Sequence, residues 1–240
     1  MLQRAFPIVN KGDFDYYKWE NKLLNTEVEI EEYCSWKYNP YMKTAVITGA
    51  STGIGRAIAY RLAEDGFHTI LVARSEGGLS KTKALIQSAG GSSEVISADL
   101  STIETIDDLV RKIQISHQQV DVLVNVAGIW HGKDIVFADT QFQDFDKKTI
   151  IDTIHVGTLA PLLLVHGLVP SMPSRSKIVN ISGTFSSGAK GWLPYYVSKR
   201  AIEDLTVGLA EELMEKRYSG QLYITIRCRN RSVQKVLSRI

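Results

Sequence analysis

Short apolar runs alternate with longer amphipathic stretches between residues 43 and 227. Six runs have the length and the branched aliphatic content of buried β-strands. These predicted strands are 44–48, 68–73, 94–100, 120–128, 176–182 and 221–227. The stretches between them repeat apolar residues every three or four positions, which indicates helices. The predicted helices are 54–65, 79–89, 102–113 and 195–217, with Ser101 or Thr102 as the cap of the third, and a long helical stretch is expected to fill much of 140–169 and to end near Pro170.

This alternation predicts the fold. Strands that are apolar on both faces suit a parallel sheet covered by helices on each side. Right-handed crossovers then give a single α/β domain with a doubly wound, Rossmann-like parallel sheet. In such folds ligands bind outside the carboxyl ends of the strands, so we expect the functional residues directly after each strand.

Both ends of the chain differ in texture from this middle zone. Residues 1–41 are rich in aromatic and acidic side chains, and we interpret them as an N-terminal extension of unknown role. A partly disordered addition and a short helix docked on residues 42–227 both remain open. Residues 228–240 carry four basic residues and no acidic one. An altered chain end and a basic tail for an anionic partner are the alternatives there.

Composition narrows the choice of partners and compartment. The net charge of +2 over 240 residues favours neither nucleic acid nor an anionic membrane as a partner. No uninterrupted apolar run reaches the roughly 18 residues that suggest a bilayer span. Cys34 and Cys228 lie far apart, with neither metal-ligand nor disulfide-framework spacing. We therefore expect a cytoplasmic protein without a metal site.

A glycine-rich turn follows the first predicted strand. Gly49 permits a tight turn, Gly53 lets the backbone approach a pyrophosphate, and Gly55 lets the next helix pack closely on the sheet. The amide groups at the start of that helix favour phosphate. A purely structural turn is the alternative. The candidate cofactor-binding residues of this turn are Gly49, Ser51, Thr52, Gly53, Ile54 and Gly55.

The spacing G-x-x-x-G-x-G at 49–55, together with Y-x-x-x-K at 195–199, resembles the short-chain dehydrogenase/reductase family over residues 42–227. The resemblance implies an NAD(P)-dependent oxidoreductase that moves hydride between a nicotinamide and a small alcohol or carbonyl substrate. It also implies a homo-oligomer formed through two long helices.

Three strand ends bear on the cofactor. Arg74 follows the second strand, where an acid would bind the ribose hydroxyls and an arginine can bind a 2′-phosphate. This residue favours NADP(H) over NAD(H), with a solvent-facing arginine as the alternative. The resemblance implies that Asp99 and Leu100 contact the adenine. The family's N-N-A-G motif after the fourth strand is kept in part, as Asn125, Ala127 and Gly128 with Val126 between them.

A lysine beside a tyrosine predicts acid/base chemistry. A cation within about 4–6 Å lowers a phenol pKa by roughly 1–3 units from its free value near 10. Lys199 is that cation, and helical spacing allows Tyr195 or Tyr196 as its partner. The family pattern selects Tyr195, which leaves Tyr196 to pack or to line the pocket. The resemblance also gives Lys199 the nicotinamide ribose, and gives Ser182 the substrate oxygen, with Thr184 as the alternate.

Two positions depart from the family pattern. The resemblance implies that Gly157 occupies the place of an asparagine that holds a water in the family's proton relay, while His155 nearby is interpreted as a structural or surface histidine. Residues 228–240 contain neither a Pro-Gly turn nor a seventh strand, so the C-terminal edge is expected to be truncated. A catalytically impaired dinucleotide-binding or interaction protein is therefore the competing hypothesis.

Overall fold

The structure is a computed structural model that describes residues 42–130, 140–183, 185, 188–214 and 222–227, the last of these by backbone alone. By its contacts the chain divides into two units, Met1–Met42 and Lys43–Ile240. The second unit contains every element described below. The expectations for residues 1–41 and 228–240 lie outside the described residues.

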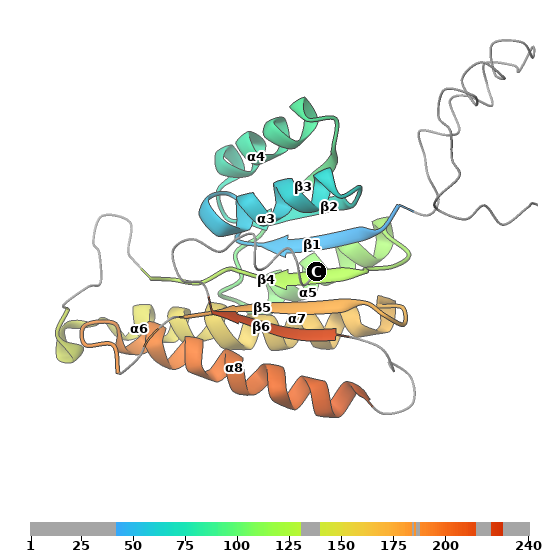
Figure 1. Cartoon of the computed structure of the whole chain (residues 1–240). Helices are drawn as coiled ribbons and strands as arrows, with labels where there is room; N and C mark the ends of the chain where they lie inside the picture. The colour runs from blue at the N-terminus through green and yellow to red at the C-terminus, as the bar shows by residue number, and fades with distance from the viewer. Residues whose placement is uncertain (1–41, 131–139, 184, 186–187, 215–221, 228–240) are drawn as a thin grey trace, which may run out of the picture. The chain divides into compact units, whose positions relative to one another are not determined.

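A parallel sheet of six strands forms the centre of this unit (Figure 1). Its spatial order is β3-β2-β1-β4-β5-β6, the doubly wound order in which the strand sequence reverses between β1 and β4. The predicted α/β Rossmann-like fold is thereby confirmed. The strands are β1 (Thr44–Thr48), β2 (His68–Ala73), β3 (Ser92–Ser97), β4 (Val122–Asn125), β5 (Lys177–Ser182) and β6 (Leu222–Arg227).

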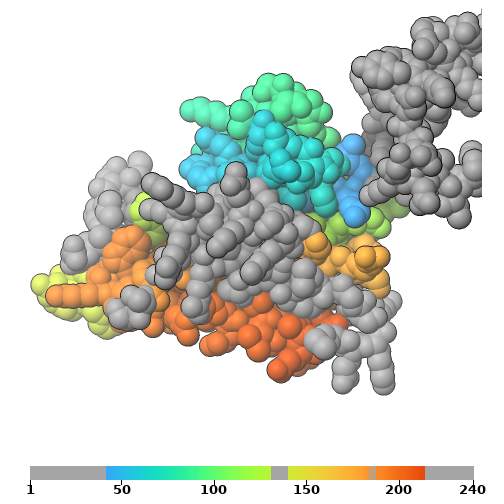
Figure 2. Space-filling model, in the orientation of Figure 1, coloured from blue at the N-terminus to red at the C-terminus, as the bar shows by residue number. Residues whose placement is uncertain are grey.

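The helices join successive strands. Two of them, α3 (Gly53–Glu64) and α4 (Glu76–Ser88), pack on one face, where Ile58 and Leu79 are fully buried. The opposite face is covered by α5 (Ile103–Ser116) and α7 (Ala160–Leu168), with buried Ile113 and Leu164 against the strands. On the same side α8 (Leu193–Met214) contacts β5 and β6 and forms a long outer surface (Figure 2).

The long helical stretch expected within 140–169 is present as the run Lys147–Ser171, but it is not a uniform α-helix. A short turn, η1 (Phe142–Asp144), precedes α6 (Lys147–Ile154), and a π-helical segment, η2 (His155–Leu159), then leads into α7 and the turn η3 (Val169–Ser171). Pro161 has no N–H, so it cannot donate the α-helical bond to the carbonyl of Gly157. The break in helical regularity therefore coincides with a residue that cannot continue it.

Length and composition alone would let the helical run Lys147–Ser171 cross a membrane, at a mean hydropathy of 1.4. Half of the apolar window is buried inside the fold, as in the core helix of a globular domain. The sequence contains no uninterrupted apolar run long enough for a bilayer span, yet this helix passes a test of length and mean hydropathy. Because half of its apolar window is buried in the fold, it is weak evidence for a membrane span.

Strand ends also differ from the expectation in ways that matter for the site. The fourth strand was expected over 120–128 and ends at Asn125. Its next two amides, those of Val126 and Ala127, donate to the hydroxyl of Thr48 at 3.0 and 3.2 Å. The chain leaves the ladder here because a side chain of β1 takes over its hydrogen bonds.

Candidate active site at the carboxyl edge of the sheet

The glycine turn between β1 and α3 has the shape that a diphosphate group requires. Gly49 and Gly53 adopt positive φ angles of 68° and 54°. A Cβ on Gly55 would lie 2.2 Å from the carbonyl oxygen of Gly49, so only glycine lets the helix start this close to the turn. A Cβ on Gly53 would meet nothing within 4 Å, so the backbone is open there.

The amide groups in the first turn of α3 face this opening, and neither a capping side chain nor an acidic residue of the described structure neutralises their partial positive charge. Thr52 precedes the helix in extended conformation, and its side chain makes no capping hydrogen bond in the described structure. No acidic residue occupies the first helical turn. Ser51 is half-buried and Ile54 packs against the core beneath the turn. The amide groups and the partial positive charge of the helix start therefore fit a phosphate group.

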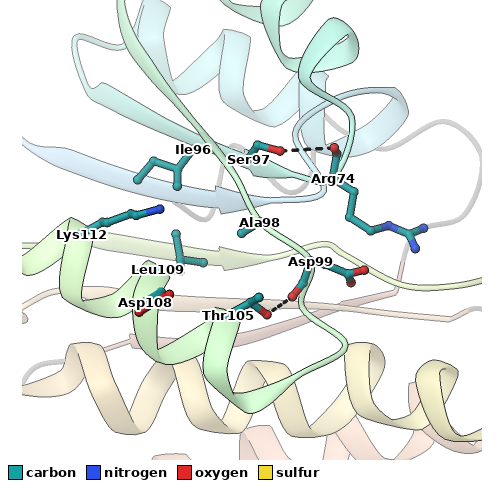
Figure 3. A pocket seen from close by; sticks show the side chains of 9 residues that line it. All are labelled: Arg74, Ile96, Ser97, Ala98, Asp99, Thr105, Asp108, Leu109 and Lys112. Carbon is teal, nitrogen blue, oxygen red and sulfur yellow. Dashed lines mark hydrogen bonds between the residues drawn. The ribbon is translucent and has the colours of Figure 1, made fainter.

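A cavity of about 260 Å³ lies beside the ends of β2 and β3 (Figure 3). Arg74 and Asp99 extend their side chains from the same end of these strands. Asp99 accepts a bond from the Ser101 amide at 3.1 Å, which orders the strand end, and Leu100 beyond it is buried. The lining residues are Arg74, Ile96, Ser97, Ala98, Asp99, Thr105, Asp108, Leu109 and Lys112.

The exposed guanidinium of Arg74 and the ammonium of Lys112 give this cavity two basic groups beside two acidic ones. A hydrogen bond fixes the backbone of Arg74, because its carbonyl accepts from the Ser97 hydroxyl at 3.3 Å. The side chain therefore starts from a fixed position at the rim of the cavity. The site thus combines a diphosphate turn with a cavity at the adenosine end that bears an arginine, and these residues fit a dinucleotide with an extra phosphate.

The retained N-V-A-G segment joins the turn to the middle of the sheet. A Cβ on Gly49 would come within 3.0 Å of the Ala127 amide, so the two segments touch. Asn125 is buried and donates to Asn180 at 2.9 Å, and Asn180 donates to Thr206 of α8 at 2.9 Å. These side-chain amides link β4, β5 and α8 across the centre of the site.

Lys199 is directed at one of the two tyrosines. Its side chain is only 3% exposed, its Nζ donates to the carbonyl of Ile181 at 2.7 Å, and the same atom lies 5.6 Å from the centre of the Tyr195 ring. A Cβ on Gly128 would lie 3.5 Å from Lys199 Nζ and 3.6 Å from Cε2 of Tyr195. The end of β4 therefore meets both residues.

The other sequence candidates take different places. The ring of Tyr196 packs edge-on against Phe185 at 5.6 Å. Ser182 ends β5 beside the carbonyl that holds Lys199, and it is 3% exposed. Thr184, its alternate, lies outside the described residues. His155 Nδ1 lies 3.1 Å from the carbonyl oxygen of Leu100, which agrees with the structural interpretation.

An aromatic group around Tyr195 was missed in the sequence. Trp192 contacts Tyr195 at 5.9 Å between ring centres and stacks on Trp130 at 6.1 Å with 13° between planes. Phe185 meets Tyr195 edge-on at 5.8 Å. The available signal was position, because Trp130 lies two residues after Gly128 and Trp192 three before Tyr195.

Gly157 packs directly against α8. A Cβ at this position would lie 2.7 Å from the hydroxyl and 2.8 Å from the Cβ of Ser198, the neighbour of Lys199. A side chain here therefore requires Ser198 to move. Glycine is therefore the residue that fits the present distance between position 157 and α8.

Comparison with known proteins agrees with this geometry. The family model for short chain dehydrogenases matches residues 43–228. A fatty acyl-CoA reductase from Acinetobacter baylyi is 34% identical over 180 residues, which cover 74% of this chain and 59% of that protein. The chain thus matches about three fifths of that relative's length.

Two solved structures extend the likeness to the fold. A metagenomic short-chain oxidoreductase in complex with NADP shares 33% identity, with a TM-score of 0.66 over 72% of this chain and 77% of the other. A short chain dehydrogenase from Burkholderia cenocepacia in complex with NADP shares 27% identity, with a TM-score of 0.68 over 77% and 73%. Sequence, fold and the order of the strand-end motifs place this chain in the short-chain dehydrogenase family.

Proposed function

We propose that this protein is an NADP(H)-dependent oxidoreductase that interconverts an alcohol and a carbonyl compound. The observation that carries the proposal is the position of buried Lys199 against Tyr195 at the edge of the sheet that also presents the glycine turn. The NADP-bound relatives and Arg74 support the choice of cofactor. When bound, the nicotinamide supplies or accepts the hydride.

The cofactor would lie along the carboxyl edge. The turn Gly49–Gly55 would hold its diphosphate, Arg74 its 2′-phosphate, and Asp99 and Leu100 its adenine. Asn125, Ala127 and Gly128 would flank its nicotinamide half, and Lys199 would hold the neighbouring ribose. The support is their common position, because each follows the end of β1, β2, β3 or β4 or lies on α8.

Tyr195 would be the acid/base. Its phenol would give a proton to the carbonyl oxygen during reduction and take it back during oxidation, while the Ser182 hydroxyl would orient that oxygen. The positive charge of Lys199 favours the phenolate and so lowers the energy of the proton transfer. The carbonyl of Ile181 fixes the ammonium from the other side.

The aromatic group bears on the substrate class. Trp130 is 46% exposed and stacks on Trp192, which in turn contacts Tyr195. Flat apolar faces of this kind bind apolar or aromatic ring systems by stacking and burial. We therefore expect a carbonyl carried by an apolar, preferably planar, group.

A catalytically impaired dinucleotide-binding protein is the second candidate, and Gly157 is the observation that favours it. The side chain that relatives place there is missing, and Ser198 leaves no room for it. The backbone offers a partial substitute, because the carbonyl of Gly157 lacks its usual donor at Pro161 and can hold a water. For this reason we favour the active enzyme.

The assembly and compartment complete the proposal. Exposed apolar residues lie on α6, η2 and α7 at Ile151, Leu159 and Leu162, and on α8 at Val197 and Val207. Such surfaces suit a homo-oligomer formed by these helices. We place the protein in the cytoplasm, with residues 42–227 as the dehydrogenase domain.

A matched pair of variants tests the function. Tyr195→Phe and Tyr196→Phe each remove one hydroxyl and keep the ring. Tyr195→Phe should still bind NADPH but lower the rate of carbonyl reduction by about 10²–10⁴-fold. Tyr196→Phe should reduce carbonyls at nearly the wild-type rate. NADPH binding without turnover of any ketone or aldehyde by the wild-type chain would favour the impaired protein instead.

A further inference from the structure

Two histidines and a glutamate converge at the edge of the sheet opposite to the cofactor turn. His68 begins β2, Glu94 lies on β3, and His117 caps the end of α5. Each residue can present one ligand atom, and these three atoms lie within 4.8 Å of one another. The cluster therefore joins three elements at the amino ends of the strands.

One of these imidazoles contains a buried nitrogen without a partner. His68 Nδ1 lies 2.7 Å from the hydroxyl of Ser92, while Nε2 has no hydrogen-bond partner in the described structure and is inaccessible to solvent. With the proton on Nδ1, the serine oxygen accepts it, and Nε2 keeps a lone pair that no hydrogen bond uses. A second-shell hydrogen bond of this kind is what fixes a metal-binding imidazole.

The charged groups around the cluster act in opposite directions on a bound cation. Glu94 supplies one negative charge, whereas the ammonium of Lys83, whose field also acts on His68, opposes a cation from α4.

The distance between the two imidazole rings agrees with one shared ion. Two imidazoles on a tetrahedral zinc each have their centre about 3.2 Å from the metal, so their centres lie about 5.2 Å apart. The rings of His68 and His117 are 5.3 Å apart. The Nε2 of His117 lies 2.8 Å from Glu94 Oε1, so a metal would have to enter between the members of this pair.

We propose that His68, Glu94 and His117 bind a divalent transition metal, for which Zn²⁺ is the best match, with water as a fourth ligand. Two imidazoles and one carboxylate are a donor set that zinc accepts. The side chains of His117 and Glu94 are 15% and 34% exposed, so solvent can reach the site. Because it lies at the amino ends of β2 and β3, the ion would brace β2, β3 and α5 and take no part in hydride transfer.

Cobalt provides a direct probe of this site in the full-length chain. After dialysis against a chelator, Co²⁺ should give the visible absorption of a four-coordinate nitrogen/oxygen site, saturating at one ion per chain and reversed by Zn²⁺. Thiolate ligands would add a strong near-ultraviolet band and would assign the ion to the cysteines instead. That band, or no bound Co²⁺ at all, overturns the proposal.

Variants locate the ion within the cluster. His117→Gln and Glu94→Gln should each weaken Co²⁺ binding by more than the roughly 10–100-fold that loss of an outer-shell partner costs. His166→Gln, on the exposed side of α7, is the matched control and should bind as the wild type does. Unchanged affinity in both cluster variants would contradict the site.

Thermal unfolding gives a second readout that does not depend on spectroscopy. Zn²⁺ should raise the unfolding midpoint of the wild type and of His166→Gln, because an ion that binds only the folded chain stabilises it. Zn²⁺ should leave the midpoint of His117→Gln nearly unchanged, and circular dichroism without metal shows whether that variant is folded. An equal rise in all three proteins would exclude the cluster as the cause.

Discussion

Lys199 holds its charge 5.6 Å from the centre of the Tyr195 ring and is fixed there by a 2.7 Å hydrogen bond to a backbone carbonyl. A buried ammonium held by this hydrogen bond has few other positions to occupy. The geometry therefore distinguishes the adjacent tyrosines in a way that helical spacing does not.

The pH dependence of oxidation should report this arrangement. Alcohol oxidation needs the phenolate of Tyr195, so its rate should rise with pH through the pKa of that group. Lys199→Met keeps the length of the side chain and removes the charge. The rise should then move to higher pH by about 1–3 units, since the ammonium favours the phenolate. A pH–rate profile at saturating NADP⁺ measures the shift, and an unmoved profile would contradict the proposed role of Lys199.

Cofactor choice should depend on Arg74. Arg74→Gln removes a charged partner of the 2′-phosphate, and charged hydrogen bonds contribute about 1.5–3 kcal/mol. NADPH affinity should therefore fall by roughly 10–100-fold, while NADH affinity stays near its starting value. Lys81→Gln, an exposed basic residue of α4 outside the cavity, is the control. Equal losses for both cofactors on fluorescence titration would argue against a phosphate-specific contact.

The preference for aryl over aliphatic ketones should depend on Trp192. Trp192→Ala removes the ring that stands between Trp130 and Tyr195. We expect KM for an aryl ketone to rise by about 2–10-fold, in line with 0.5–1.5 kcal/mol for an aromatic pair beyond its burial. Trp192→Phe should recover much of the loss. Steady-state kinetics with aryl and small aliphatic ketones compare the two, and similar changes in KM for both classes would remove stacking as the explanation.

Stability should respond to a single methyl group at Gly157. Gly157→Ala places a Cβ against Ser198, and overpacking of this kind costs about 1–3 kcal/mol of unfolding free energy. Gly77→Ala in α4, where a Cβ meets nothing within 4 Å, should be stabilising by about 0.4–1 kcal/mol. Urea unfolding measures both. Gly157→Ala as stable as the wild type would show that Ser198 moves aside easily.

The strands and the glycine turn could be predicted from sequence because their signals are local. Each buried strand is a continuous apolar run, and the turn at Gly49–Gly55 stands in one segment. Element ends were less predictable. The apolar character of 120–128 continues past Asn125, but the amides of Val126 and Ala127 bond to Thr48, which lies almost 80 residues earlier.

The parts that escaped prediction depend on contacts between distant segments. The π-helical segment at His155–Leu159 lies within an apolar stretch whose periodicity reads as ordinary helix. Trp130 and Trp192 are unremarkable singly and become a group only when the ends of β4 and α8 meet. In the same way His68, Glu94 and His117 follow no ligand spacing along the chain, and the fold brings them together.

Because Gly157 lies against Ser198, the residues that can occupy these two positions depend on each other during evolution. A lineage with this packing cannot gain an asparagine at 157 in one substitution without disturbing the helix that carries Lys199. A smaller residue at position 198 would remove the atoms that an added Cβ at position 157 meets first. The double variant Gly157→Asn/Ser198→Gly should therefore be more stable than the sum of the two single effects on the free energy of unfolding predicts. An asparagine at position 157 thus depends on which residue already occupies position 198.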